Sequence, residues 1–215
     1  MRLLINDQYD HMPWDALDAL VFDVGRVLLR FDPPKIAAEL LPDDPELQQK
    51  VVEHVTSTPY WVMLDHGVIT QEEALEAMSK RVPELREAIR TFLYGWRDLK
   101  EPIWEGVRAA QAAKVHGKKL YILSNYHREA FAFIEKKYDF FQLFDGKLVS
   151  SHVRMMKPEP MIFKTIVATF GLIPERTLFI DDAPHNVESA LMEGWQGFCY
   201  QIPGSLDAFI GEENA

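Results

Sequence analysis

Three apolar segments of the chain end in polar side chains of the types that bind metals and anions. These side chains are Asp23, the pair Ser124 and Asn125, and the pair Asp181 and Asp182. A buried carboxylate at the end of a strand is costly to desolvate unless it is paired or bound to a metal. In open α/β sheets the carboxyl ends of the strands form the edge at which ligands bind. We therefore expect the three groups to converge at one site, although they are far apart in the chain.

The residue types predict phosphoryl-transfer chemistry at that site. Carboxylates that meet without a counter-charge repel one another, so one of them must take up a proton. A divalent cation removes this conflict, and ligation by oxygen atoms alone suits Mg²⁺. Lys157, in a loop before Pro158, and the hydroxyl of Ser124 would bind an anion on the other side. A site of this composition catalyses mainly by positioning and by neutralising charge.

Each of these residues has a simpler interpretation when it is taken alone. Asp23 and the Asp181–Asp182 pair could form turns or helix caps, Ser124 could be a cap, and Lys157 could be a solvated lysine. The ordered set, with its members at strand ends around a helical insert, favours the functional interpretation.

The elements that must position this set are alternating strands and helices. Apolar strands are predicted at residues 17–24, 119–123, 148–153, 177–180 and 196–202, and helices at residues 103–115, 128–138, 159–170 and 184–193. This alternation is typical of an α/β fold with a parallel sheet.

Residues 34–97 interrupt the alternation and contain no convincing strand. Helical spacing is present at residues 35–41, 45–57, 70–81 and 83–94. Thr70 and Glu73 have the spacing of a capping box at the start of the third of these helices. We therefore predict an all-helical insert directly after the first strand.

Composition restricts the partners and the compartment. The chain has 33 acidic residues against 23 lysines and arginines, so no broad surface for nucleic acid is expected. No apolar run approaches the length that spans a membrane, and residues 1–14 are too short and too acidic for a signal peptide. Cys199 is the only cysteine, which fits a reducing compartment. We expect a cytoplasmic protein with a loosely held N-terminal extension over residues 1–15; its oligomeric state does not follow from the sequence.

Four motifs of the chain resemble those of the haloacid dehalogenase superfamily. They are VFDVGRVL at residues 21–28, ILSN at residues 122–125, KPEPMIF at residues 157–163 and FIDDAPHNV at residues 179–187. Their order and spacing fit over residues 17–202. The resemblance implies a Rossmann-like parallel sheet flanked by helices, built from residues 16–33 and 98–215, with residues 34–97 as an inserted helical cap domain.

The place of the insert resembles subfamily I of this superfamily, in which a helical C1 cap lies between the first two motifs. The segment LDHGVITQEE at residues 64–73 is similar to a cap segment of that subfamily's sugar-phosphatase-like branch. The implied substrate is a small phosphorylated metabolite, a phosphate monoester, with a sugar phosphate favoured.

The resemblance also implies a role for each residue of the set. Asp23 would be the nucleophile that attacks phosphorus and forms an aspartyl-phosphate. The implied catalytic residues are Asp23, Ser124 and Lys157, and the implied Mg²⁺ ligands are Asp23, the backbone carbonyl of Gly25, Asp182, and Asp181 directly or through water. The implied substrate-binding residues are Ser124, Asn125, Lys157 and, in the insert, Trp61 and His66.

One position departs from the pattern of most phosphatases in this superfamily. They have a second aspartate two residues after the nucleophile, which serves as general acid and base, but here that residue is Gly25. Such proton transfer contributes about 10²–10⁴-fold in rate. A branch that acts on sugar phosphates, including glucose 1-phosphate, also has glycine there. A cap residue or the substrate could supply the proton instead. His66 and His127 are candidates, although either could equally be a surface histidine. Otherwise the protein is a slow, promiscuous phosphatase or not an enzyme.

Two other functions stay open. A 2-haloacid dehalogenase would use the aspartate against carbon without a metal, but those enzymes have an aromatic residue at the position of Gly25 and lack a paired-acid site. A non-catalytic binding protein on the same fold would have no need to retain Asp23, Lys157 and both acids of the fourth motif.

Specificity is expected in the insert and its hinges. The candidate residues there are aromatic or basic, namely Tyr60, Trp61, His66, Trp96 and Arg97. Aromatic faces and an arginine suit a sugar or another polar phosphate ester. An equally good interpretation places Trp61 and Trp96 in the packing between the insert and the main domain.

Overall fold

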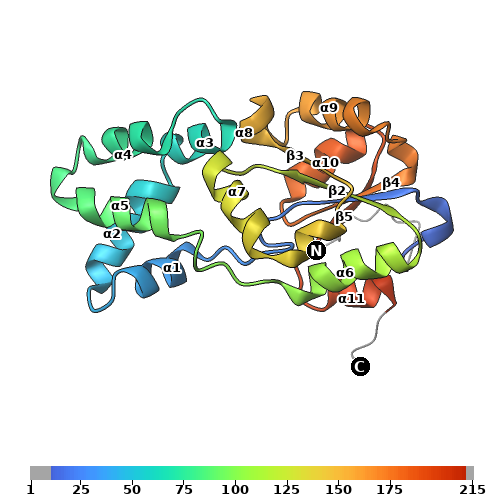
Figure 1. Ribbon diagram of the computed structural model, residues 1–215, viewed down its shortest axis with the longest axis horizontal. Helices are drawn as coiled ribbons and strands as arrows, with labels where there is room; N and C mark the ends of the chain where they lie inside the picture. The colour runs from blue at the N-terminus through green and yellow to red at the C-terminus, as the bar shows by residue number, and fades with distance from the viewer. Residues whose placement is uncertain (1–10, 212–215) are drawn as a thin grey trace.

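The protein is built on one parallel sheet, as the computed structural model shows for residues 11–211 (Figure 1). The strands are β1 (Ala19–Phe22), β2 (Lys119–Ser124), β3 (Gly146–Val149), β4 (Thr177–Asp181) and β5 (Gln196–Cys199), in the order β3-β2-β1-β4-β5. All neighbouring pairs are parallel, and β1 is paired on both sides. The predicted α/β fold is confirmed, and β1 is central because the chain adds β2 and β3 on one side and β4 and β5 on the other.

Helices cover both faces of the sheet. They are α6 (Trp104–Val115), α7 (Arg128–Lys137), α8 (Ser150–Val153), α9 (Pro160–Phe170), α10 (Pro184–Met192) and α11 (Ser205–Ile210), with short 3₁₀ turns at Trp14–Ala16, Asp139–Leu143 and Pro174–Arg176. Leu20 and Phe22 of β1 pack on the side of α6, α7 and α11, whereas Val21 packs on the side of α9. Burial on both faces explains why β1 is apolar at every position.

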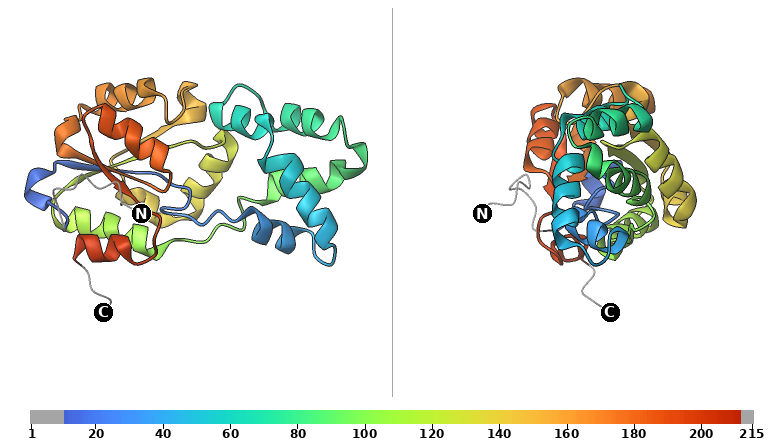
Figure 2. Two further views of the ribbon diagram at one scale, coloured as in Figure 1. Left: turned by 180° about the vertical axis from the view of Figure 1, so that it is seen from behind. Right: turned by 90° about the vertical axis from the view of Figure 1, so that its left-hand side faces the viewer.

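The helical insert, residues 33–95, lies beside the sheet rather than on one of its faces (Figures 1 and 2). It contains α1 (Pro33–Leu40), α2 (Pro45–Thr56), α3 (Pro59–His66), α4 (Gln71–Ser79), a 3₁₀ turn (Pro83–Leu85) and α5 (Arg86–Gly95). The predicted capping box is present, because Thr70 and Glu73 exchange side-chain and backbone hydrogen bonds at the start of α4. The domain boundaries at residues 33/34 and 97/98 stay predictions.

Two chain segments connect the insert to the sheet and run side by side. The Arg30 N–H donates to the Glu101 carbonyl at 2.8 Å, and the Ile103 N–H donates to the Leu28 carbonyl at 2.8 Å. The Lys100 ammonium also reaches the Arg30 carbonyl at 3.0 Å. Entry and exit of the insert are therefore tied together at one hinge, close to the end of β1.

Three local predictions were wrong. Residues 150–153 form helix α8 rather than the end of a strand, since Ser150 and Ser151 are buried and their side chains favour a helix start over a ladder. Helix α3 was not predicted, because five consecutive residues from Tyr60 to Leu64 are apolar or aromatic and hide a helical period. Helix α11 was missed because it is only six residues long.

The described part of the N-terminal extension is not loosely held. The Met12 N–H donates to the Phe209 carbonyl at 2.7 Å, and the Met12 side chain belongs to the core. The Trp14 ring stacks on His116 with centroids 4.2 Å apart. These contacts attach residues 11–16 to α6 and α11, while residues 1–10 of the predicted extension lie outside the described residues. Over residues 11–211, every helix is too short or too polar to cross a bilayer.

Candidate active site

The polar groups predicted from the sequence meet at the carboxyl edge of the central strands. Asp23 is the first residue after β1, and its N–H donates to the Ile180 carbonyl at 2.9 Å, next to Asp181 at the end of β4. Ser124 ends β2 on the other side of β1. The direction of strand addition reverses at β1, which is where open α/β sheets bind ligands.

Lys157 joins two of these strand ends. Its Nζ lies 2.9 Å from Asp23 Oδ1 and 2.5 Å from Asp181 Oδ2, and its side chain is only 1% exposed. Burial opposes the charged form, but Asp181 and Asp23 offset burial, so the pKa of Lys157 is raised. The lysine therefore stays an ammonium and holds a fixed positive charge beside Asp23.

Three carboxylates form a cluster that fits a divalent cation. One oxygen from each of Asp23, Asp181 and Asp182 can be chosen so that all three lie within 4.8 Å of one another. Burial raises the pKa of Asp23 to about 6, with Lys157 acting in the opposite direction and the two neighbouring acids adding to the rise. Burial and Asp181 also raise the pKa of Asp182. Three ionised carboxylates exceed the positive charge of the Lys157 ammonium and of the Arg26 guanidinium beside Asp182, and a hard divalent cation would neutralise the excess.

Asp181 is already held by protein donors. The Ala183 N–H donates to Oδ1 at 2.8 Å, and Asn186 Nδ2 lies 3.0 and 3.1 Å from the two carboxylate oxygens. These donors orient Asp181 toward Lys157 and leave Asp182, whose side chain is 22% exposed, as the more available ligand. Asn186 belongs to the fourth sequence motif, but no role was predicted for it. Its position in the first turn of α10, five residues after Asp181, could have indicated this contact.

Ser124 and Asn125 have different surroundings. Ser124 Oγ is buried without a hydrogen-bond partner among residues 11–211, although such groups are nearly always bonded. It is therefore ready to bind an oxygen of a ligand. Asn125 instead exchanges two 2.9 Å hydrogen bonds with the backbone N–H and carbonyl of Lys157. These bonds position Lys157, and a direct contact of Asn125 with substrate stays a prediction.

Gly25 has open space on its side-chain face. A Cβ built there would meet only Asp23 Oδ2, at 4.0 Å. The loop from Val24 to Leu29 turns back tightly, with the Leu29 N–H donating to the Val24 carbonyl at 2.9 Å. Arg26 takes a left-handed conformation in this turn, with φ 58°. The structure therefore accommodates an acid at position 25, and the Gly25 carbonyl as a metal ligand stays a prediction.

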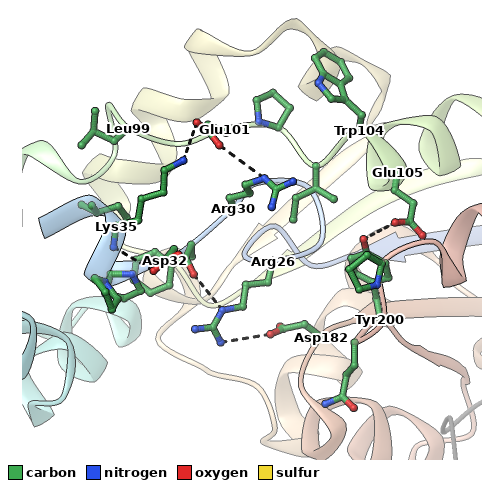
Figure 3. A pocket seen from close by; sticks show the side chains of 18 of the residues that line it. Arg26, Arg30, Asp32, Lys35, Leu99, Glu101, Trp104, Glu105, Asp182 and Tyr200 are labelled. Atoms are coloured by element: carbon green, nitrogen blue, oxygen red, sulfur yellow. Dashed lines mark hydrogen bonds and ion pairs between the residues drawn. The ribbon is translucent and has the colours of Figure 1, made fainter. Parts of the chain in front are cut away.

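An open cavity of about 970 Å³ adjoins the site through Asp182 (Figure 3). Arg26 stands at its inner end, donating through Nε to the Phe31 carbonyl at 3.3 Å, with a guanidinium nitrogen 3.6 Å from Asp182 Oδ2. Arg30 and Lys35 face Glu101 farther out. Each of these three cations therefore has an acidic partner in the cavity wall.

An aromatic cluster closes the site on the side of the insert. Trp61 packs on Phe31, Trp96 and His127, with ring centroids 5.7, 5.2 and 4.3 Å apart. Tyr126 packs on Trp96 at 5.5 Å. The packing interpretation of Trp61 and Trp96 matches these contacts. Contact of Trp61 with a substrate stays a prediction.

The turn after α3 docks on α8. His66 Nε2 donates to the Arg154 carbonyl at 2.8 Å, and a Cβ added at Gly67 would lie 2.3 Å from the Ser151 carbonyl oxygen. Ser150 Oγ donates to the Asp65 carbonyl. His66 is therefore engaged in holding the insert against the sheet domain, and its predicted role toward substrate stays untested.

Two further titratable groups lie on the insert side, and neither was singled out from the sequence. Asp65 Oδ1 lies 3.4 Å from His127 Nε2. Burial, with the charge of Asp23 added, raises the pKa of Asp65 to about 8. Lys100 Nζ sits 3.9 Å from the Phe31 ring centroid, and burial lowers its pKa to about 6. Asp65 falls within the cap segment at residues 64–73, and this motif could have indicated a functional role for it. No sequence motif contains Lys100.

Comparison with known proteins places these features in a family. The model of the haloacid dehalogenase-like hydrolases matches residues 17–192. The chain is 25% identical over 185 residues to drimenol cyclase drtB of Aspergillus calidoustus, covering 85% of this chain and 34% of that protein. It is 25% identical over 154 residues to flavin mononucleotide hydrolase 1 of Arabidopsis thaliana, covering 68% of this chain and 58% of that protein. The chain therefore spans about a third of the length of the first relative and about three fifths of the length of the second.

Solved structures share the fold at low sequence identity. A family enzyme of Bacteroides thetaiotaomicron, in complex with magnesium and inorganic phosphate, superposes with a TM-score of 0.69 at 19% identity and covers 88% of this chain and 98% of that chain. L-2-haloacid dehalogenase from Xanthobacter autotrophicus, with chloropropionic acid covalently bound, gives a TM-score of 0.62 at 18% identity over 84% of this chain and 76% of that chain. Both similarities extend over most of this chain.

Proposed function

Because the chain belongs to the haloacid dehalogenase-like hydrolases, we propose that it is a Mg²⁺-dependent phosphatase of the helical-cap subfamily. Asp23 is the nucleophile, and the substrate is a small phosphate monoester. The observation that carries the proposal is the cluster of Asp23, Asp181 and Asp182 around the single buried Lys157. A dehalogenase has no use for a pair of further carboxylates beside its nucleophile, whereas a metal-dependent phosphatase needs them as metal ligands.

The residues support a reaction in two displacement steps. An Asp23 carboxylate oxygen bonds to phosphorus while the bond from phosphorus to the leaving oxygen breaks, which gives an aspartyl-phosphate. The Lys157 ammonium and the unpartnered Ser124 hydroxyl bind phosphoryl oxygens as charge builds on them. Water then attacks phosphorus and releases Asp23 and inorganic phosphate. Mg²⁺ held by Asp23 and Asp182 would neutralise the carboxylates and the phosphoryl group.

The insert and the Gly25 position support a sugar phosphate as the favoured substrate. The leaving group would lie between the strand ends and the insert, where the Trp61 and Trp96 rings and the unpartnered Tyr126 hydroxyl are found. Flavin mononucleotide hydrolase, one of the relatives, is named for a larger phosphate monoester. A screen of phosphorylated metabolites, with chloroacetate included, separates these substrates and the dehalogenase alternative.

Hydrolysis of p-nitrophenyl phosphate tests the proposed activity. We expect turnover with Mg²⁺, loss of turnover with EDTA, and a loss of about 10⁴-fold or more in Asp23→Asn because the nucleophile is gone. Asp43→Asn is the matched control, since Asp43 is exposed and has φ 70°, a conformation that asparagine tolerates. Full activity in EDTA or in Asp23→Asn would refute the proposal.

A further inference from the structure

The reaction proposed above needs a proton for the leaving oxygen, and Gly25 cannot provide it. The open space beside Gly25 borders Asp23 Oδ2 alone within 4 Å. A protein donor for a poor leaving group would therefore have to come from another part of the chain. The sheet-side groups do not serve, because Lys157 is committed to two carboxylates and Asp181 is held by three donors.

Asp65 is fixed in place on the insert side of the site. Its backbone carbonyl accepts from Ser150 Oγ, and the same Oγ accepts from the Tyr126 N–H at 3.0 Å. Tyr126 is two residues beyond Ser124, at the end of β2. The docking of Gly67 against Ser151 holds the turn that follows. A carboxyl group from the insert is therefore tied by one serine to the strand end that carries the phosphoryl-binding hydroxyl.

The groups that face Asp65 leave it without a cationic contact. Its side chain is 17% exposed, and Oδ1 lies 3.4 Å from Nε2 of His127, which burial keeps neutral by lowering its pKa to about 3. No lysine or arginine within residues 11–211 forms an ion pair with Asp65. Asp23, Lys157 and Lys100 act on it only through longer-range charge, and the pKa of Asp65 rises to about 8. Asp65 therefore carries its proton at neutral pH.

Unpartnered polar atoms lie in the same region. Trp96 Nε1 and Tyr126 Oη are buried without a hydrogen-bond partner in the described part of the chain. Buried polar groups are costly when unpaired. A hydroxylated leaving group between Ser124 and Asp65 would supply partners for them, which places the leaving oxygen on the Asp65 side.

We propose that Asp65 is the general acid and base of this phosphatase, acting from the insert in place of a side chain at position 25. The inference rests on the proposed function. As the bond from phosphorus to the leaving oxygen breaks, the Asp65 carboxyl gives its proton to that oxygen, and the alcohol departs. In the second step the Asp65 carboxylate takes a proton from the attacking water, phosphorus is transferred from Asp23 to that water oxygen, and inorganic phosphate leaves. Asp65 ends the cycle protonated, as it began.

A series of substituted phenyl phosphates, running from p-nitrophenyl to phenyl, tests this role with Mg²⁺ present. The wild type should show little dependence of kcat/KM on leaving-group pKa, because the proton arrives as the bond breaks. Asp65→Asn should keep p-nitrophenyl phosphate turnover within a few-fold and lose about 10²-fold or more with phenyl phosphate. Asp43→Asn, an exposed acid-to-amide change in the same insert, should follow the wild type.

The double variant Gly25→Asp with Asp65→Asn returns an acid to the sheet side and should recover part of the lost phenyl phosphate turnover. An equal loss on both substrates in Asp65→Asn, a double variant as slow as the single one, or a steep leaving-group dependence in the wild type would each overturn the role of Asp65. The leaving-group dependence is measured on the wild type, so this test does not depend on whether a variant folds. A wild type inactive on every ester with Mg²⁺ would instead refute the phosphatase itself.

Discussion

The two sides of the active site act on their buried lysines in opposite directions. On the sheet side, Lys157 contacts Asp23 and Asp181, and these acids outweigh burial and raise the pKa of the lysine. On the insert side, burial acts on Asp65 and Lys100 without such contacts, raising the pKa of the acid to about 8 and lowering that of the lysine to about 6. The sheet side therefore offers fixed charges that bind a phosphoryl group, while the insert side offers neutral groups that can exchange protons.

Removing the sheet-side cation should have the largest effect. Lys157→Met leaves Asp23 and Asp181 buried beside each other without a counter-charge. We expect turnover to fall about 10²–10³-fold and the free energy of unfolding to fall by about 3–5 kcal/mol. The measurements are p-nitrophenyl phosphate kinetics and urea denaturation, with the exposed Lys136→Met as control. A variant as stable as Lys136→Met would show that the carboxylates do not depend on this lysine.

Disturbing the docking of the insert should have an intermediate effect. Gly67→Ala places a Cβ 2.3 Å from the Ser151 carbonyl oxygen, so the turn at the end of α3, two residues after Asp65, must move away from α8. We expect turnover of phenyl phosphate to fall by about 10-fold or more, as misplacement of a catalytic group does. Gly117→Ala is the matched control, because Gly117 has φ 69° and its Cβ would meet nothing within 4 Å.

The Gly117→Ala control separates the effect of disturbing the Gly67–Ser151 contact from the effect of backbone strain. Both glycines are left-handed, so each alanine costs about 1–2 kcal/mol of conformational energy, and only the change at Gly67 adds a clash. If the two variants have equal activity, the contact between the turn and α8 does not position Asp65.

The pH dependence of stability should show the smallest effect and should separate the two sides. The pKa of Asp65 is higher in the folded protein than in the unfolded chain, so its contribution to stability is full below pH 4 and is lost as pH rises through 8. In EDTA the wild type should lose about 1–3 kcal/mol relative to Asp65→Asn between pH 5 and pH 7.

Asp23 and Lys100 titrate in both proteins, and because Asp23 raises the pKa of Asp65 and Asp65 raises that of Lys100, the comparison reports Asp65 together with this coupling. Urea denaturation of the two proteins at several pH values gives the difference directly. A difference that is constant with pH would mean that Asp65 is ionised in the folded protein and that the two sides do not differ in this way.

The sequence indicated the sheet side well and the insert side poorly, for a physical reason. Asp23, Ser124 and Asp181 each follow an apolar strand, and parallel strands bring their carboxyl ends to one edge. Lys157 could be assigned to the same site because it lies in the loop that precedes a helix. The positions of Asp65 and Lys100 depend instead on how the insert docks, through Ser150 and through the paired hinge segments. Such contacts join residues far apart in the chain and leave no local pattern.

The same reason explains which elements of the fold were predicted and which were missed. The strands and the helices that flank them have clear periods, and their predicted bounds differ from the structure by a few residues. Helices α3 and α8 contact each other where the insert meets the sheet domain, and each is too short to show a clear amphipathic period, with eight and four residues. Both were missed, and both hold Asp65.

Trapping of the covalent intermediate tests the central claim most directly. Protein mixed with p-nitrophenyl phosphate and Mg²⁺ and quenched in acid should carry one phosphoryl group on the peptide that contains Asp23, as peptide mass spectrometry reports. The account predicts this adduct in the wild type and in Asp65→Asn, and its absence in Asp23→Asn. An unmodified Asp23 peptide during turnover, or an Asp23 ester formed with chloroacetate and accompanied by chloride release, would contradict it.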